Sequence, residues 1–305
     1  MITPRLLRRS FGRALQWRFL LLWLALVALP AAAALFPLWR FVDEHLGRSP
    51  RAQQLVAGLD SHAVADLVKQ LSEAHAVKAL GAGAWAGALL AILLMPIGAG
   101  AAVSLARADE ALRFRELLTG AAEHYGRMLR MLLVGLLPAG LAVAGAAGLS
   151  HAAAKAAEHA VLESQALRYA RLAAIGGFLL LFVAQLTVDA GRAAFAVEPQ
   201  RRSAWFAWGS GARLFAHRPW RTALAGAAPL ALAALAAAAT FSLRLRIHQS
   251  GPGKMAVAFL LAELAVAAIG WHRAARLIAL AELMRADAAE RAHQQRLSAP
   301  APSVT

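Results

Sequence analysis

The sequence predicts an all-α membrane protein, a polytopic bundle of six transmembrane helices. Two observations indicate this class. Hydrophobic residues make up 60% of the 305-residue chain and the mean hydropathy is positive, which is too apolar for an ordinary soluble domain of this length. The apolar residues also gather in long runs of about 20, the number of helical residues that crosses a hydrocarbon layer of about 30 Å. Helices are expected because a chain in lipid must satisfy its backbone hydrogen bonds internally.

The expected spans are residues 19–39, 81–103, 131–149, 172–191, 222–243 and 255–271. Of the 32 basic residues, 21 lie before the first span, in the second and fourth connections, or in the tail. Under the positive-inside rule these segments and both termini face the cytoplasm. The net charge of +15 therefore needs no nucleic-acid partner, since the arginines are spread over membrane-flanking segments without a recognised nucleic-acid fold. We expect one domain over 1–297 and a disordered tail at 298–305.

The first span allows two interpretations. Arg8 and Arg9 resemble a twin-arginine export signal, and the alanines after Pro30 resemble a cleavage region. Apolar residues nevertheless resume as far as Trp39, which gives the length of a retained signal-anchor helix. We expect retention, whereas cleavage would leave five spans.

The connection at about residues 42–80 is expected outside the cytoplasm, because its basic and acidic residues nearly balance. Ser61 is placed to cap a helix in which Val64, Leu67 and Leu71 follow helical spacing. Such a helix either lies over the outer ends of the spans or forms a cap or a docking face. Interfacial helices of both kinds have the same sequence pattern.

Two cytoplasmic segments, residues 109–126 and 199–218, are predicted to be amphipathic interfacial helices. In the second one, Trp205 and Trp208 interleave with Arg213 and Arg218. Such a helix lies in the headgroup layer, with its rings in the acyl boundary and its guanidinium groups on phosphates. Pro219 is expected to end it before the fifth span. The same pattern is also found where no specific lipid is recognised.

These two segments resemble each other at an offset of 91 residues. The matched pairs are Gly120 and Gly211, Arg127 and Arg218, Arg130 and Arg221, Gly135 and Gly226, and Pro138 and Pro229. The match predicts two parallel helical-hairpin repeats, each with two spans joined by a cytoplasmic amphipathic helix. Arg127 and Arg130 are three residues apart and therefore share a helix face, and the same holds for Arg218 and Arg221. All four are candidates for lipid-headgroup contact.

Three polar residues in or beside the spans are candidates for function: Glu263, Gln185 and Asp189. Glu263 lies near the middle of the sixth span, where a carboxylate must be protonated, paired or exposed to water. Gln185 lies at a similar depth, so a hydrogen bond between the two is one interpretation. A proton-coupled or substrate-binding carboxylate is the other. Asp189 is expected at the inner interface, paired with Arg192 at i+3.

Glycines and prolines within the predicted spans also allow two interpretations each. Gly83 and Gly87 are four residues apart, a spacing that predicts close helix packing within the chain or across a homo-oligomer. Pro138 and Pro229 interrupt helices at matching places, which is one indicator of a transport site. Prolines are also tolerated in membrane helices without any transport.

The sequence contains no enzyme signature. There is no cysteine, no HExxH pair, no serine elbow and no phosphate-binding loop, and the 10 histidines are scattered. We therefore expect a protein that is not an enzyme and has no catalytic residue, no metal site and no cofactor.

The fourth span ends in a short motif that continues into the next connection: Asp189-Ala190-Gly191-Arg192, then Glu198, then Arg201-Arg202-Ser203-Ala204. With six spans and an outer loop after the first, this pattern resembles uncharacterised bacterial six-helix inner-membrane proteins. Those are loosely similar to the membrane domain attached to some glycerophosphodiester phosphodiesterases. The resemblance covers most of the chain and implies the bacterial inner (cytoplasmic) membrane. It implies no catalysis, because the soluble phosphodiesterase domain is absent.

Two functions follow from these patterns. The leading hypothesis is a non-enzymatic scaffold or accessory factor in an envelope process. Its basic interfacial helices would contact anionic membrane lipids, a protein partner or a second copy of the chain. The alternative is a small transporter or lipid-handling permease with Glu263 and Gln185 in its pathway.

Overall fold

The computed structural model describes residues 4–46, 69, 74–108, 110–160, 162–247 and 251–298. Within these ranges the chain forms eight α-helices and no strand, which confirms the all-α class. Two helices are short, α1 (Pro4–Ala14) and α8 (Ala204–His217). Six are long and apolar enough to cross a membrane: α2 (Trp17–Leu46), α5 (Ala74–Arg107), α6 (Phe114–Glu158), α7 (Glu163–Val197), α9 (Pro219–Leu245) and α10 (Pro252–Ser298). Each predicted span lies inside one of these six.

The helices form two compact units. The first contains Met1–Gln16, Ala99–Ala231 and His272–Thr305, and the second contains Trp17–Gly98 and Leu232–Trp271. Helices α5, α9 and α10 each contribute residues to both. Most of the expected outer loop, including Ser61 and the helix predicted to follow it, lies outside the described residues. The tail after Ser298 also lies outside them.

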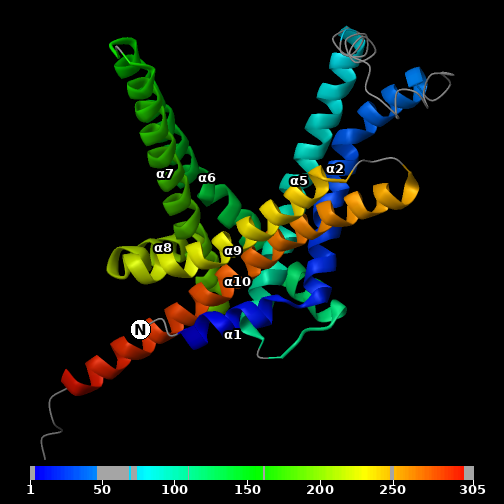
Figure 1. Cartoon of the computed structure of the whole chain (residues 1–305). Helices are drawn as coiled ribbons and strands as arrows, with labels where there is room; N and C mark the ends of the chain where they lie inside the picture. Colours follow the sequence, from blue (N-terminus) through cyan, green and yellow to red (C-terminus); the bar gives the residue numbers. More distant parts are fainter. Residues whose placement is uncertain are drawn as a thin grey trace, which may run out of the picture. The chain divides into compact units, whose positions relative to one another are not determined.

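In the second unit, α2 and α5 pack closely where α5 carries glycine (Figure 1). A methyl group on Gly83 would lie 2.6 Å from Cγ of Pro37, and one on Gly87 would lie 2.7 Å from Cβ of Ala34. Side chains larger than hydrogen therefore do not fit at either position without displacing α2. The close packing predicted for these glycines occurs within the chain.

In the first unit, α6 and α7 form a hairpin and α8 packs against both (Figure 1). Gly211 of α8 meets α7 so closely that a Cβ there would lie 2.5 Å from the backbone nitrogen of Gly191. A Cβ on Gly100 of α5 would similarly lie 2.9 Å from the carbonyl oxygen of Ala121 on α6. Gly100 and Gly191 are related by the same offset of 91 residues. The repeat stays a prediction, and these two corresponding helix crossings support it.

The expectation of a separate helix at 109–126 is wrong. Helix α6 begins at Phe114 and continues unbroken to Glu158, whereas α8 is separate and gives way to α9 at Pro219 as predicted. The difference has a local cause. Proline has no backbone N–H to continue a helix but suits the first position of a new one. Met128 occupies the corresponding position of α6 and can continue its helix.

Arginines from α1 and α10 close the end of α5. Arg13 donates to the carbonyl of Ala108 and forms an ion pair of 3.1 Å with Glu282. Arg285 donates to the carbonyl of Ala106 at 3.0 Å. The last carbonyls of a helix have no intrahelical partner and carry partial negative charge, so cations stabilise them. Arg13 is therefore part of the fold of the first unit as well as of the basic N-terminal segment.

Candidate functional site

Asp189 lies in a buried ion cluster that joins α7 to α10. Nη1 of Arg192 lies 2.5 Å from one of its carboxylate oxygens, and Arg276 of α10 contacts the other. The side chains are 7% exposed for Asp189, 6% for Arg276 and 18% for Arg192. The ion pair predicted between Asp189 and Arg192 is therefore present. A buried carboxylate of this kind is tolerated only because opposite charges surround it.

Two further side chains belong to this cluster. Gln185 directs its amide nitrogen to both oxygens of Asp189, at 3.4 Å each. Arg273 interacts electrostatically with Asp189, Arg192 and Arg276. Three arginines thus surround one carboxylate, and the cluster carries an excess of positive charge.

Gln185 therefore has a partner other than the Glu263 considered from the sequence. Glu263 is half-buried on α10, in the second unit. Its side chain makes no hydrogen bond or ion pair with another described residue of that unit. Its role stays a prediction.

The motif at the end of the fourth span is explained by this geometry. Asp189 and Arg192 supply the ion pair, and Gly191 lets α8 approach α7, since a Cβ there would lie 2.9 Å from Cα of Trp208. Farther along, Glu198 pairs with Arg201 at 2.6 Å. Each of these positions has a packing or pairing role that its residue type fits.

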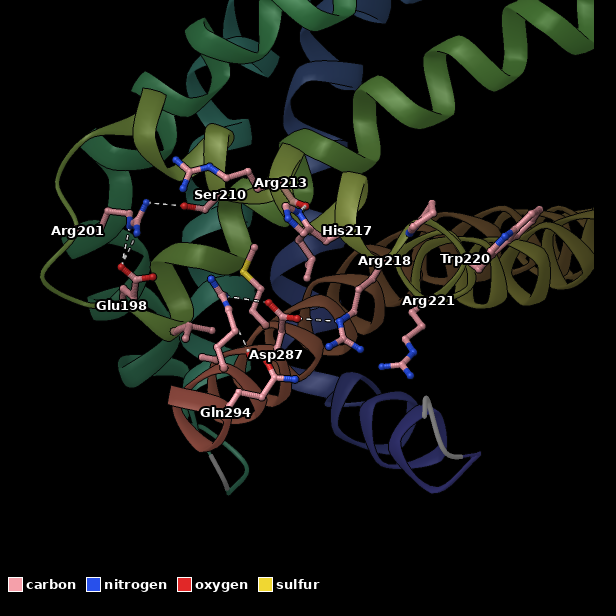
Figure 2. Close-up of a pocket in the computed structure, with 16 residues that line it drawn as sticks. Glu198, Arg201, Ser210, Arg213, His217, Arg218, Trp220, Arg221, Asp287 and Gln294 are labelled. Carbon is pink, nitrogen blue, oxygen red and sulfur yellow. Dashed lines mark hydrogen bonds and ion pairs between the residues drawn. The ribbon is translucent and has the colours of Figure 1, made fainter. Parts of the chain in front are cut away.

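A separate cavity of about 690 Å³ lies where the link between α7 and α8, helix α8, the start of α9 and the last part of α10 meet. Its charged and polar walls are Arg201, Arg213, Arg218, Arg221, Arg291, His217, Ser210, Gln294, Glu198 and Asp287. Figure 2 shows Glu198 and Arg201 at one end of this cavity and Trp220 and Arg221 at the other. We call it the arginine cavity.

Most arginines of the arginine cavity are held by acids of the same unit. Arg218 donates to Asp287 at 2.8 Å and also to Glu290. Hydrogen bonds to Glu290 and then Asp287 raise the pKa of the Arg218 guanidinium, so it keeps its charge at any physiological pH. Arg291 pairs with Asp287 at 2.9 Å, whereas Arg221 approaches Glu290 only to 4.0 Å.

Arg213 differs from these neighbours. It is exposed, and its side chain makes no ion pair or hydrogen bond with any described residue. Ser210, Arg213 and His217 follow one another at spacings of three and four residues on one face of α8 and all line the arginine cavity. The Ser210 hydroxyl donates to the carbonyl of Phe206 and accepts from Arg201, so it is already engaged. The free guanidinium of Arg213 is the group on this face that suits an oxyanion.

Trp205 and Trp208, both predicted to contact lipid, have different surroundings in the structure. The indole nitrogen of Trp208 donates to the hydroxyl of Thr187 at 3.3 Å, so this ring is turned onto α7. Trp205 is 55% exposed and packs edge-on against Trp208, with ring centroids 5.9 Å apart. Trp220, at the rim of the arginine cavity, is 86% exposed. It was missed as a site residue because a tryptophan next to a span also fits an ordinary interface anchor.

Two other predicted headgroup contacts lie away from the arginine cavity. Arg127 donates to the carbonyl of Pro199 at 3.1 Å and so links α6 to the segment before α8. Arg130 donates to the carbonyl of Gly126 at 3.1 Å on its own helix. Neither residue is brought together with Arg213, Arg218 or Arg221.

Comparisons with models of known families, with curated proteins and with solved structures found no match to this chain. In the part of the chain that the structure describes, no three His, Cys, Asp or Glu side chains lie close enough together to hold a metal ion.

Proposed function

We propose that this integral membrane protein binds anionic lipid headgroups with its arginine cavity and serves, without catalysis, as an accessory or scaffold in a bacterial envelope process. The observation that supports this proposal most directly concerns Arg213, which has no acid partner among the described residues and lines a cavity of about 690 Å³. Five arginines line this cavity, against the acids Glu198 and Asp287 in its wall and Glu290 beside it. The remaining positive charge suits an anion.

The predicted topology places the arginine cavity at the cytoplasmic surface of the bilayer. Anionic lipids give that leaflet a negative surface potential, and each nearby Lys or Arg contributes about 1 kcal/mol of attraction. The exposed rings of Trp205 and Trp220 suit the boundary between headgroups and acyl chains. An arginine cavity with Trp220 in its wall fits a lipid phosphate better than it fits a soluble anion.

The proposal predicts that Arg213→Gln weakens binding of phosphatidylglycerol to the purified full chain. We expect about a fivefold loss, corresponding to about 1 kcal/mol for one guanidinium. Bound lipid is counted by native mass spectrometry after titration with phosphatidylglycerol or phosphatidylcholine. Arg202→Gln is the matched control, because Arg202 is exposed in the same segment but does not line the arginine cavity. Equal losses in the two variants would refute the proposal.

A transporter or lipid-handling permease is the second candidate, favoured by Glu263. A half-buried carboxylate within a predicted span, with no partner among the described residues of its unit, fits a proton- or substrate-coupled role. This candidate predicts that Glu263→Gln and Glu263→Leu both abolish activity in a complementation assay. If neither change matters while Arg213→Gln and Trp205→Ala do, the transporter is excluded.

A further inference from the structure

A second, smaller cleft lies between α6 and α7 in the first unit, with a volume of about 300 Å³. Its walls are apolar along most of their length and include Leu136, Ala139 and Leu181. Its only polar side chains are Gln185 and Arg192, both on α7 toward the end of that helix. Arg192 thus belongs to the cleft as well as to the cluster around Asp189.

We propose that this cleft binds one anionic phospholipid from the surrounding bilayer, with its phosphate on Arg192 and one acyl chain between α6 and α7. The site is separate from the arginine cavity, since the two share no lining residue. Either site can therefore fail without the other.

The dimensions of the cleft match one leaflet. Leu181 and Arg192, the two ends of the lining on α7, are 11 positions apart, which is about 17 Å at 1.5 Å per residue. Half of a hydrocarbon core of about 30 Å is about 15 Å. Arg192 directly follows the predicted span at 172–191. The cleft is therefore apolar at the depth of acyl chains and cationic at the depth of phosphates.

The charges of the buried cluster call for a further anion. Both oxygens of Asp189 are already engaged, one by Arg192 and one by Arg276, so two guanidinium groups share one carboxylate. Nε of Arg192 is buried and has no hydrogen-bond partner among the described residues. Of the arginines in the cluster only Arg192 lines the cleft. A phosphate on the exposed part of the Arg192 side chain, which is 18% exposed, supplies a further negative charge to the cluster.

Gln185 supports the same occupant. Its side chain is exposed in the cleft although it lies within a predicted membrane span, and its bonds to Asp189 are long, at 3.4 Å. A polar group facing hydrocarbon is costly unless it finds a partner. The ester carbonyls of a phospholipid lie next to its phosphate on the acyl side and accept hydrogen bonds from such an amide. Free phosphate would leave both this amide and the apolar walls unmatched.

The test uses the full chain in vesicles of equal parts phosphatidylglycerol and phosphatidylcholine. The probe is phosphatidylglycerol with a photoactivatable diazirine in one acyl chain, and mass spectrometry identifies the labelled peptides. Ala139→Phe fills the cleft, and we expect about a tenfold loss of label on the facing parts of α6 and α7. Ala144→Phe is the matched control, because Ala144 is exposed on the same helix outside the cleft. Equal labelling of the two variants would mean surrounding bilayer lipid only and would overturn the proposal.

A second arm tests the headgroup with the same diazirine chain on phosphatidylcholine. The unsubstituted protein is expected to label about fivefold more with phosphatidylglycerol. Arg192→Gln should remove that preference, and Arg192→Lys should restore part of it. Equal labelling by the two lipids in the unsubstituted protein would also overturn the proposal. Arg213→Gln should leave cleft labelling unchanged. A failure of the cleft proposal is therefore distinguishable from a failure of the function proposed for the arginine cavity.

Discussion

At the scale of single residues, Asp189 is a buried carboxylate that joins α7 to α10 in the first unit. It accepts from Arg192 on its own helix and from Arg276 on α10, and it lies beside Gln185. Ions in such a cluster have given up most of their hydration. Their mutual attraction offsets this cost only while every charge has its partner.

Asp189→Asn should therefore destabilise the protein by about 3–5 kcal/mol, because two buried guanidinium groups lose their counter-ion. The free energy of unfolding can be measured by denaturant titration in mild detergent. Glu198→Gln is the control: Glu198 is 51% exposed, so its pair with Arg201 contributes about 1 kcal/mol or less. A loss for Asp189→Asn no larger than that of the control would contradict the cluster's structural role.

The sequence predicted one part of this cluster and not the other. The pair of Asp189 and Arg192 is visible from their spacing of three residues on one helix. Arg276 comes from α10, far along the chain, and no local spacing relates it to Asp189. The pairing of Arg218 with Asp287 and Glu290 was likewise not predicted, and its contact with headgroups stays a prediction. Long-range pairs of this kind depend on tertiary packing.

At the scale of the elements, the position of α8 depends on Gly211. Gly211 lies against the backbone of α7, where a Cβ would be 2.5 Å from the carbonyl oxygen of Thr187. Backbone atoms cannot yield as a flexible side chain can, so any larger residue must move the whole helix. Because α8 carries Ser210, Arg213 and His217, such a movement would also reshape the arginine cavity.

Gly211→Ala should lower the free energy of unfolding by about 1–3 kcal/mol, because the added methyl group overpacks the contact with α7. The same variant should bind phosphatidylglycerol more weakly. Gly209→Ala on the same helix is the control, since a Cβ there meets nothing within 4 Å. The control should be neutral or more stable by about 0.5–1 kcal/mol, because alanine favours helix over glycine. Thermal unfolding in detergent compares the two. If both variants behave alike, α8 is not held by the contact at Gly211.

Helix boundaries were predictable where a single residue decides them. Pro219 separates α8 from α9 as expected, because its ring and missing N–H act locally. The continuity of α6 was not predicted. An amphipathic stretch followed by an apolar one has the same sequence pattern whether it forms one continuous helix or two. The closure of α5 by Arg13 and Arg285 was equally hidden, because both come from other helices.

At the scale of the whole molecule, the six spans followed from composition and length alone, since lipid accepts few other forms of backbone. The division into two units did not. Each unit collects segments that are distant in the sequence, and α5, α9 and α10 contribute to both. Hydropathy describes each span separately and carries no information about which spans pack together.

The predicted topology can be tested directly because the chain contains no cysteine. Single cysteines introduced as Ser164→Cys and Ser298→Cys occupy exposed positions at the start of α7 and the end of α10. With both termini cytoplasmic, a membrane-impermeant maleimide should label the first in intact cells and the second only after lysis. The reverse pattern would invert the topology and move the arginine cavity to the other face.

The cluster around Asp189 also has a consequence for the order of synthesis. Arg192 is made within a fraction of a second of Asp189, whereas Arg276 follows 87 residues later, on the order of ten seconds at about 5–20 residues per second. During that interval the nascent chain carries Asp189 with only its neighbour on α7 for compensation. The arrival of α10 then completes the pairing, so the synthesis of α10 locks the fourth span in place. Nascent chains that end before Arg276 should accordingly be degraded faster than complete ones.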